Sequence, residues 1–389
     1  MTTVPETSAP PAVPFGAEHT DREIRQQPRV WAEMRERVRE QRDALDAFLA
    51  PLLAEPGLRV VLTGAGTSAY AGGVVRSALA AVLGVTVEAV ATTDIVAEPA
   101  GCFEDRARPT LLVSFARSGQ SPESLAATEI ADRLLDRCAH LVITCNAGGA
   151  LAVAHRDRAG SHVLLTPSEA EDRGFAMTSS LTCMLLGALD ALGRGRVRGL
   201  GAAAQAAAAV LTPDSTARIT AFARRDLDRF VHLGSGPLKA LAGESALKLL
   251  ELTGGRVGSL PETSLGFRHG PKAFLTPRTG VLLFVSNDPH TRRYDLDILR
   301  ELAGALPAGQ VVAVAGRADG LAEAAPAAEA WLLPGMSEAD DAALALPAVV
   351  CAQLVALHAS LRLGITPDNP FPAGEVNRVV QGVTIHPLD

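Results

Sequence analysis

Three residues of one short segment could move protons. In KALAGESALKLLEL, Glu244, Lys248 and Glu251 are spaced i, i+4 and i+7, so a helix would carry all three on one face. A carboxylate can take a proton from carbon, and an ammonium group beside it can stabilise charge on a neighbouring oxygen. The alternative is a solvated Glu–Lys pair, which stabilises a helix by only about 0.2–0.5 kcal/mol.

The choice of lysine favours the chemical role. Of 36 basic residues, only Lys239, Lys248 and Lys272 are lysines, and they lie close together in the sequence. An amine changes its pKa readily and acts as a compact charge, which a guanidinium group does not. We therefore infer that these positions require an amine and that a guanidinium group could not replace it.

His269 adds a group that titrates near neutral pH. It lies in FRHGPKAF, a Gly/Pro loop in which nothing about burial demands a histidine. None of the nine histidines belongs to a paired metal motif such as HExxH. We expect no metal ion and no cofactor.

Two segments rich in glycine and hydroxyl groups follow predicted strands and could bind an anion. The first, GAGTSAYAGG, places Gly66, Thr67 and Ser68 where a strand turns into a helix. Exposed N–H groups and the positive end of the helix dipole favour an anion there. A dinucleotide fingerprint fits less well, because the spacing is not GxGxxG and Asp94 lies beyond the usual offset of a ribose-binding acid.

The second segment, SFARSGQSPES, gathers hydroxyl groups and a glycine directly after a strand. One hydroxyl would suffice to cap the next helix, so several favour an oxyanion, and a phosphomonoester held between both loops fits best. The expected contacts are Arg117, Ser118, Gly119, Gln120 and Ser121. A third cluster, Thr178 to Ser180, is first of all a helix cap, and Ser179 is expected to contact the ligand through its position.

The elements that must position these residues recur along the chain. From Gly57, short β-branched runs alternate with Ala- and Leu-rich helices, which indicates parallel strands with helices on both faces. The later stretch RFVHLGSGPLKALAGESALKLL resembles LRVVLTGAGTSAYAGGVVRSALA. We predict an α/β fold of two similar doubly wound, flavodoxin-like units, residues 57–211 and 212–389, joined by a linker at LTPDST.

Residues 1–56 precede these units. The first 18 or so are rich in Pro, Thr and Ala and predict a loose arm. Thr20 to Glu23 then predicts a capping box that begins an amphipathic helix, with Trp31 and Met34 on its apolar face. Packing on the body or on a partner subunit is the better interpretation of this helix than a catalytic role.

Composition excludes several classes of protein. The formal net charge is −7 and no block of Lys or Arg is dense enough for a nucleic-acid surface. Five cysteines without a CxxC spacing fit a reducing compartment. We find no signal peptide and no apolar run that approaches the roughly 20 residues of a membrane span, so we expect neither membrane nor nucleic acid as a partner and the cytoplasm as location.

Together these segments resemble the sugar isomerase (SIS) domain family in its tandem form. The strand–GAGTS–helix turn, the FARSGQSPES loop, the ESALKLLE helix and the HGP loop occur in that family's order, from about Gly57 to near the C-terminus. EDRGFAMTSS, SLGFRHGPK and VSNDPHTRRYD are similar to one subgroup, the galactosamine-6-phosphate deaminase/isomerase type, also named tagatose-6-phosphate ketose/aldose isomerase.

The resemblance implies roles for the matched residues. Ser68, Ser118 and Ser121 are expected to contact a phosphate group. Ala116 departs from a serine of the family motif, for which Arg117 or Ser114 would compensate.

The catalytic roles are implied in the same way. Glu251 matches the carboxylate that moves a proton between C1 and C2. Lys248 matches an amine that assists at the substrate hydroxyl groups, and His269 matches a histidine that helps to open the sugar ring, commonly from a neighbouring subunit. Whether Glu262 or His386 takes part is left open.

These roles predict an enzyme that converts galactosamine 6-phosphate to tagatose 6-phosphate and ammonia. One alternative is an enzyme on another amino-sugar or glycated-amine phosphate, of the glucosamine-6-phosphate deaminase or deglycase type. Another is a sensor that binds a sugar phosphate without turning it over. The lack of a basic helix-turn-helix-like segment argues against a sensor. The family also implies a homodimer or homotetramer with sites at subunit interfaces.

Overall fold

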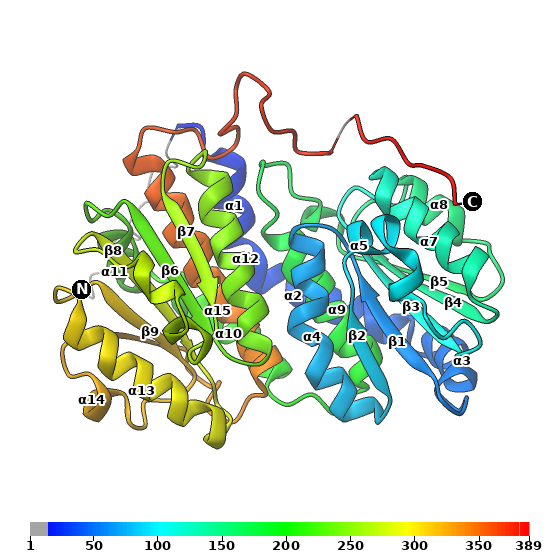
Figure 1. The fold of residues 1–389 in the computed structure, drawn as a ribbon, viewed down its shortest axis with the longest axis horizontal. Coiled ribbons are helices and arrows are strands. Elements are labelled where there is room, and N and C mark those ends of the chain that lie inside the picture. Colours follow the sequence, from blue (N-terminus) through cyan, green and yellow to red (C-terminus); the bar gives the residue numbers. More distant parts are fainter. Residues whose placement is uncertain (1–14, 381, 389) are drawn as a thin grey trace, which may run out of the picture.

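Two parallel sheets form the frame of the protein (Figure 1). The structure, a computed structural model, describes residues 15–380 and 382–388. Most of the arm predicted for the first 18 residues lies outside this part of the chain. The α/β class predicted from the alternating pattern is confirmed.

Both sheets have five strands and the same topology. Their orders are β2-β1-β3-β4-β5 and β10-β9-β8-β6-β7. Counted from its own first strand, each reads 2-1-3-4-5, the flavodoxin-like order, and every strand pair is parallel. The predicted internal repeat is therefore confirmed, while the predicted unit boundaries stay predictions.

The strands of the first half are β1 (Arg59–Thr63), β2 (Thr86–Ala89), β3 (Thr110–Ala116), β4 (Cys138–Thr144) and β5 (Ser161–Leu165). Those of the second half are β6 (Arg229–Gly234), β7 (Gly258–Glu262), β8 (Thr279–Val285), β9 (Val311–Ala315) and β10 (Glu329–Leu332). The central strands β1, β3 and β8 are buried along their whole length, because helices cover both faces of each sheet.

The first half contains helices α4 (Thr67–Leu83), α5 (Thr92–Ala97), α6 (Pro99–Cys102), α7 (Pro122–Leu134), α8 (Ala150–His155), α9 (Ser179–Gly193) and α10 (Leu200–Val210). The rest of the chain has α11 (Pro213–Ala223), α12 (Pro237–Leu252), α13 (Pro289–Ala305), α14 (Leu321–Ala324) and α15 (Asp341–Arg362). Short 3-10 turns lie at Ser168–Ala170, Gly266–Arg268 and Pro271–Phe274. Of the predicted linker LTPDST, only residues 211 and 212 lie between α10 and α11, and residues 213–216 form the first turn of α11.

A layer of helices joins the two sheets (Figure 1). Helix α12 packs against α4 and α15, and α4 also packs against α9. One buried apolar cluster includes Val60 of β1, Leu282 of β8 and Leu354 of α15, so the two halves share a core. Such a shared core favours folding of the two halves as one body.

Helix α15 corrects one expectation from the sequence. Its 22 residues are long and apolar enough to cross a membrane, so the statement that no apolar run approaches this length was wrong. The apolar window of α15 is wholly buried in the protein. A helix that is apolar on all sides is typical of the centre of a large core.

The segment for which one N-terminal helix was predicted forms three helices. These are α1 (Glu18–Arg25), α2 (Gln27–Glu40) and α3 (Arg42–Leu53). Trp31 and Met34 of α2 are buried in the shared core, as expected for a helix packed on the body. The predicted capping box is wrong, because α1 begins at Glu18 and makes no side-chain cap of its own. Instead, Asp368 from the C-terminal segment accepts hydrogen bonds from the backbone N–H groups of His19 and Thr20, at 2.9 and 2.7 Å.

Helices α4 and α12 approach unusually closely at two glycines. A Cβ atom at Gly73 would lie 2.7 Å from the Cβ of Ala240, and one at Gly243 would lie 2.4 Å from the Tyr70 ring. These separations are shorter than a carbon–carbon contact, so glycine is required by packing at this seam.

We predict that Gly73→Ala destabilises the protein by about 1–3 kcal/mol, because the added methyl group must push α4 and α12 apart. Chemical denaturation followed by circular dichroism measures this. Gly304→Ala in α13 is the matched control, since nothing lies within 4 Å of a Cβ there. The control should gain up to about 1 kcal/mol from helix propensity. Equal effects of the two changes would contradict the role given to the seam.

Candidate active site

The loops after β1 and β3 lie side by side at one edge of the first sheet. The register pairs Thr63 with Ser114, so these adjacent strands end at the same edge, where the strand order reverses. Gly66 and Gly119 adopt positive φ angles of 55° and 61°, which favour glycine. The two predicted anion loops therefore meet at the place where open α/β sheets usually bind ligands.

Both helices that follow these loops have open N-termini. Neither Gly66, the N-cap of α4, nor Ser121, the N-cap of α7, makes a side-chain cap. The hydroxyl of Ser121 donates instead to Glu123 at 2.6 Å, and that of Ser118 accepts from the Gln120 N–H at 3.3 Å. Backbone N–H groups of two helices are thus available to an anion. Contacts of Ser68, Ser118 and Ser121 with phosphate stay predictions.

Arg117 is buried directly after β3 and binds two backbone carbonyls. Its guanidinium group donates to Phe175 O at 3.3 Å and to Arg378 O at 2.7 Å. It thereby ties a loop of the first half to the C-terminal segment. Ser114 is buried within β3 with no hydrogen-bond partner for its hydroxyl among the described residues. Compensation for Ala116 by either residue stays a prediction.

The proton-handling residues share one face of α12, as predicted. Lys248 is fully buried, forms an ion pair with Glu251, and lies 3.6 Å from Glu244. Glu244 is buried too, whereas the side chain of Glu251 keeps 24% of its exposure. A solvated surface pair is excluded by this burial, so the alternative interpretation of the Glu–Lys spacing was wrong.

The charges of this cluster follow from burial and from each other. Burial opposes the charged form of Lys248, but the two carboxyl groups outweigh it and raise the pKa of Lys248. Burial raises the pKa of Glu244 to about 8, and Lys248 only partly offsets this. At neutral pH the cluster therefore contains a charged Lys248, while Glu244 favours its uncharged form.

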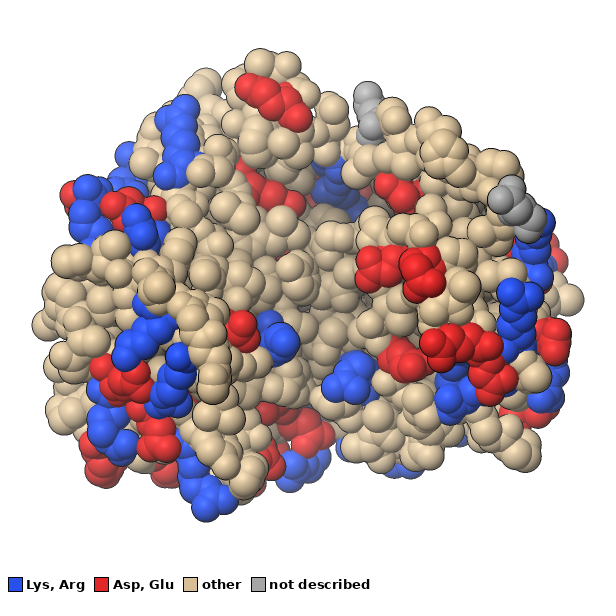
Figure 2. Space-filling model, viewed as in Figure 1, with Lys and Arg blue, Asp and Glu red and all other residues tan. Residues whose placement is uncertain are grey.

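The cluster and the anion loops belong to one site. The charge of Arg117 acts on both Glu251 and Lys248, and Thr67 of the first loop lies close enough to Glu244 to lower its pKa. The structure thus brings the start of α4, the end of β3 and the second half of α12 together between the two halves. On the face shown in Figure 2, basic and acidic side chains are interspersed and form no continuous basic surface.

His269 lies apart from these contacts. It is exposed at the end of a 3-10 turn, and its side chain makes no hydrogen bond or ion pair with a described residue. Its neighbours Arg268 and Lys272 both pair with Glu301 of α13, which anchors the loop. His386 is exposed as well. Participation of either histidine stays a prediction.

Asp172 was missed by sequence reasoning and organises the third hydroxyl cluster. It is fully buried and accepts hydrogen bonds from the N–H and hydroxyl groups of Thr178, Ser179 and Ser180. The expected cap by the hydroxyl groups of this run is therefore wrong, because Asp172 caps α9 instead, and the Ser179 hydroxyl donates to Asp172 and accepts from Gln26. Contact of Ser179 with substrate stays a prediction. An acidic residue shortly before the Thr-Ser-Ser run was the available signal.

Comparisons with known proteins agree with this geometry. The SIS domain family matches residues 52–192. The AgaS protein of Streptomyces coelicolor is 58% identical over 391 residues, with 100% of both chains covered. D-galactosamine-6-phosphate deaminase AgaS of Shewanella sp. strain ANA-3 is 42% identical, with 98% of this chain and 95% of that protein covered. The chain belongs to the AgaS family of SIS-domain proteins.

A solved structure supports the assignment of the AgaS-family fold. The crystal structure of tagatose-6-phosphate ketose/aldose isomerase from Escherichia coli superposes with a TM-score of 0.88 at 40% sequence identity. The match covers 97% of this chain and 99% of that one.

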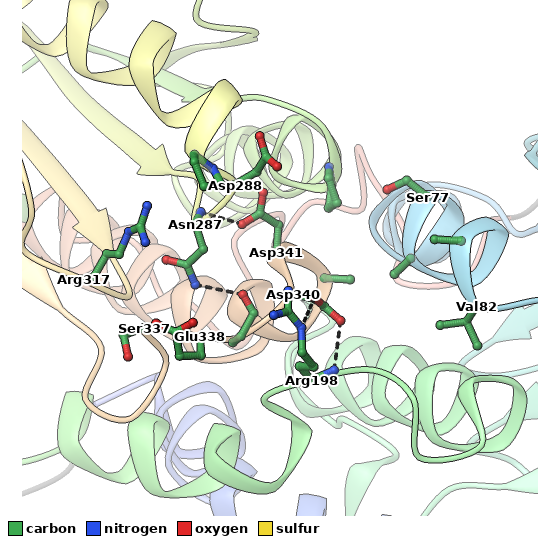
Figure 3. Close-up of a pocket in the computed structure, with 16 residues that line it drawn as sticks. Ser77, Val82, Arg198, Asn287, Asp288, Arg317, Ser337, Glu338, Asp340 and Asp341 are labelled. Atoms are coloured by element: carbon green, nitrogen blue, oxygen red, sulfur yellow. Dashed lines mark hydrogen bonds and ion pairs between the residues drawn. The ribbon is translucent and has the colours of Figure 1, made fainter.

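A cavity of this AgaS-family chain lies where α4 and Arg198 of the first half meet the helix ends of the second sheet (Figure 3). The cavity, about 490 Å³, is lined by residues that include Asn287, Asp288 and Asp341. Asp288 caps α13 by accepting from the N–H groups of His290 and Thr291, at 3.0 and 2.8 Å. The carboxylate thus occupies the helix end that is open in the first half, and its charge disfavours phosphate there.

One cluster of possible metal ligands is engaged in a hydrogen bond and an ion pair within the protein. Ligand atoms of Asp132, Cys138 and His140 lie within 4.8 Å of one another. However, His140 Nε2 bonds to one oxygen of Asp132 at 2.8 Å, and the other oxygen accepts from Arg158 at 2.6 Å. This ion-pair network lies at the start of β4, at the edge of the sheet opposite the anion loops.

Glu23 binds the loop that follows Asp172, and its burial should make the stability of the protein depend on pH. Its carboxyl group, buried in α1, accepts from the N–H groups of Arg173 and Gly174. Burial, together with the charge of Asp172, raises the pKa of Glu23 to about 7. The folded state therefore binds this proton more tightly than the unfolded chain, and the resulting stabilisation is lost as pH rises from about 4.5 through 7.

We predict that Glu23→Gln removes a pH dependence on the order of 2 kcal/mol in the free energy of unfolding between pH 5 and 8. Urea denaturation at several pH values measures it. Glu36→Gln on the exposed face of α2, where Glu36 only pairs with Arg39, is the matched control and should keep the wild-type dependence. An unchanged pH dependence in Glu23→Gln would contradict the assignment.

Proposed function

We propose that the protein is an isomerising deaminase that converts D-galactosamine 6-phosphate and water to tagatose 6-phosphate and ammonia. One observation carries the proposal: the partly exposed Glu251 carboxylate is held against a fully buried Lys248 ammonium group beside two open helix N-termini. The relatives named D-galactosamine-6-phosphate deaminase, similar over nearly the full length, support this substrate.

The reaction needs a base next to a cation. After the sugar ring opens, Glu251 removes the proton from C2 and returns it to C1, while the Lys248 ammonium group stabilises negative charge on the C1 oxygen. The C1 oxygen gains a proton as the amino group at C2 loses one, and the product is a C1 alcohol with a ketimine at C2. Water adds to this C=N bond and ammonia leaves, which gives the ketose phosphate and balances the reaction.

The phosphate group is proposed to bind across Ser68, Ser118 and Ser121 at the ends of β1 and β3. Its contacts lie away from the reacting carbons and position C1 and C2 against Glu251. Arg117 is proposed to complete the phosphate site by giving up a carbonyl contact. Because Asp288 caps the equivalent helix of the second half, phosphate binding is assigned to the first half alone.

His269 is proposed to open the sugar ring from a neighbouring subunit. Its exposure, and the absence of a side-chain hydrogen bond or ion pair with the described residues, are compatible with a role across an interface. The proposal therefore includes a homo-oligomer with sites between subunits, which acts in the cytoplasm. Analytical ultracentrifugation, and complementation of Glu251→Gln by His269→Ala in mixed oligomers, test this part.

A substrate panel tests the proposed reaction. The protein is incubated with galactosamine 6-phosphate, glucosamine 6-phosphate, tagatose 6-phosphate and a fructosamine 6-phosphate, and ammonia and ketose are followed. Ammonia from galactosamine 6-phosphate supports the proposal. Release of an amine only from another substrate would favour the second enzyme class, and tight binding without turnover would favour a sensor.

We predict that Glu251→Gln lowers kcat by at least about 10³-fold while substrate affinity changes little, because the amide fills the same space but cannot take a proton. Steady-state kinetics and calorimetric titration of substrate measure the two quantities. Glu36→Gln, which removes a carboxylate from the exposed face of α2, is the control. Turnover within tenfold of wild type would remove Glu251 from the mechanism.

Ser118→Ala is predicted to act on binding instead. Loss of one hydroxyl contact to phosphate should raise KM by about 5- to 20-fold, with a smaller effect on kcat. Inhibition by inorganic phosphate should weaken in parallel. An unchanged KM would mean that the phosphate group binds elsewhere.

A further inference from the structure

Glu244 is the one member of the α12 cluster to which the proposed mechanism gives no task. Its side chain is 1% exposed, and neither carboxyl oxygen has a hydrogen-bond partner among the described residues. A buried carboxyl group without a hydrogen-bond partner is costly, especially in its ionised form.

The neighbour is Lys248, which lies between two carboxyl groups on the same helix face. Glu251, three residues further along the helix, forms the close ion pair, whereas Glu244, four residues before Lys248, lies 3.6 Å from Lys248 Nζ. Of these two carboxyl groups only that of Glu251 is partly exposed, because the side chain of Glu244 is 1% exposed and that of Glu251 24%. The position of the ammonium group therefore depends on which of the two carboxyl groups carries a negative charge.

We propose that Glu244 is a positioning residue: in its uncharged form it leaves the Lys248 ammonium group directed at Glu251 and the substrate. When Glu244 ionises, a second anion competes for Lys248 from inside the core and draws the ammonium group away from the reacting oxygen. This inference rests on the proposed function, because it assigns Lys248 the task of stabilising the developing charge.

The burial of Glu244 sets the pH at which this competition begins. Because the carboxyl group is desolvated, its pKa is raised to about 8, so ionisation falls just above neutral pH. Arg117 at the end of β3 also acts on Lys248, but as a cation whose charge does not change in this range.

Other titratable groups lie on the elements packed against α12. Tyr70, His232 and His358 change their charge well above or well below pH 8. Tyr70 of α4 faces Glu244, and burial raises its pKa above the usual value of 10. His232 of β6 and His358 of α15 are neutral above pH 6, because burial lowers their pKa values to about 3 and about 4. Two further acidic groups lie on elements packed against α12, Glu262 at the end of β7 and Asp341 in the first turn of α15. Burial raises the pKa of Asp341 above its usual value, and its carboxyl group accepts hydrogen bonds from Ser286 and Asn287. Glu244 is therefore the group expected to titrate near pH 8.

The pH profile of kcat tests the inference. We expect wild-type kcat to fall about tenfold between pH 7 and pH 9, with an apparent pKa near 8. In Glu244→Gln, which keeps the shape but cannot ionise, kcat should change less than twofold over this range, whatever its absolute value. Tyr70→Phe and Glu262→Gln are matched controls and should keep the tenfold decline.

Three kinetic outcomes would overturn the inference. These are a tenfold decline that persists in Glu244→Gln, a flat wild-type profile, and a decline that is lost in either control. A residue needed only for packing would lower kcat equally at all pH values and leave the shape of the profile unchanged.

A second measurement does not require turnover and therefore separates this inference from the proposed function. The chain has only three lysines, so ¹⁵N-lysine labelling gives few Nζ signals, and Lys239→Arg and Lys272→Arg assign the signal of Lys248. We expect the Lys248 signal to shift with a midpoint near pH 8 in the wild-type protein and not in Glu244→Gln. A signal that does not shift between pH 6.5 and 9.5 in the wild type overturns the inference, even if Glu244→Gln fails to fold. A shift in a protein that fails the substrate panel would leave the inference about Glu244 standing and refute only the proposed function.

Discussion

The site depends on a lysine that stays charged without contact with water. Burial of an unpaired ammonium group costs several kcal/mol, so Lys248 requires its carboxyl partners on α12. Water is excluded only because α4 packs on one side of α12 and α15 on the other. These helices come from opposite halves of the chain, so the proton-handling cluster exists only when both halves are packed together.

This constraint also accounts for the close seam between α4 and α12. Glycines at positions 73 and 243 bring the two helices near enough for Thr67 and Tyr70 to act on Glu244. A wider separation would admit water and weaken every charge interaction of the cluster. Packing and electrostatics at the site are therefore set by the same contact.

The two halves keep one topology but have different chemistry at corresponding positions. In the first half the helix ends after β1 and β3 are open, whereas in the second half Asp288 caps the helix after β8. The second half instead supplies α12, whose equivalent in the first half is α4. The proposed phosphate site thus lies in one copy of the duplicated fold and the proposed proton-handling groups in the other, which fits the general separation of fold from function.

The sequence by itself determined the fold class, the internal repeat, the two anion loops and the shared face of Glu244, Lys248 and Glu251. These follow from local rules: the periods of strand and helix, the conformational freedom of glycine, and the spacing of side chains on a helix. Only the tertiary structure decided which carboxyl groups are buried. It also decided which backbone groups form hydrogen bonds with side chains that are distant in the sequence. Asp368 caps α1 across the chain, Arg117 binds the carbonyl of Arg378, and α15 is a core helix, because each depends on segments distant in sequence. Desolvation is a property of the whole fold, and it turns an ordinary Glu–Lys spacing into a charged pair with an uncharged neighbour.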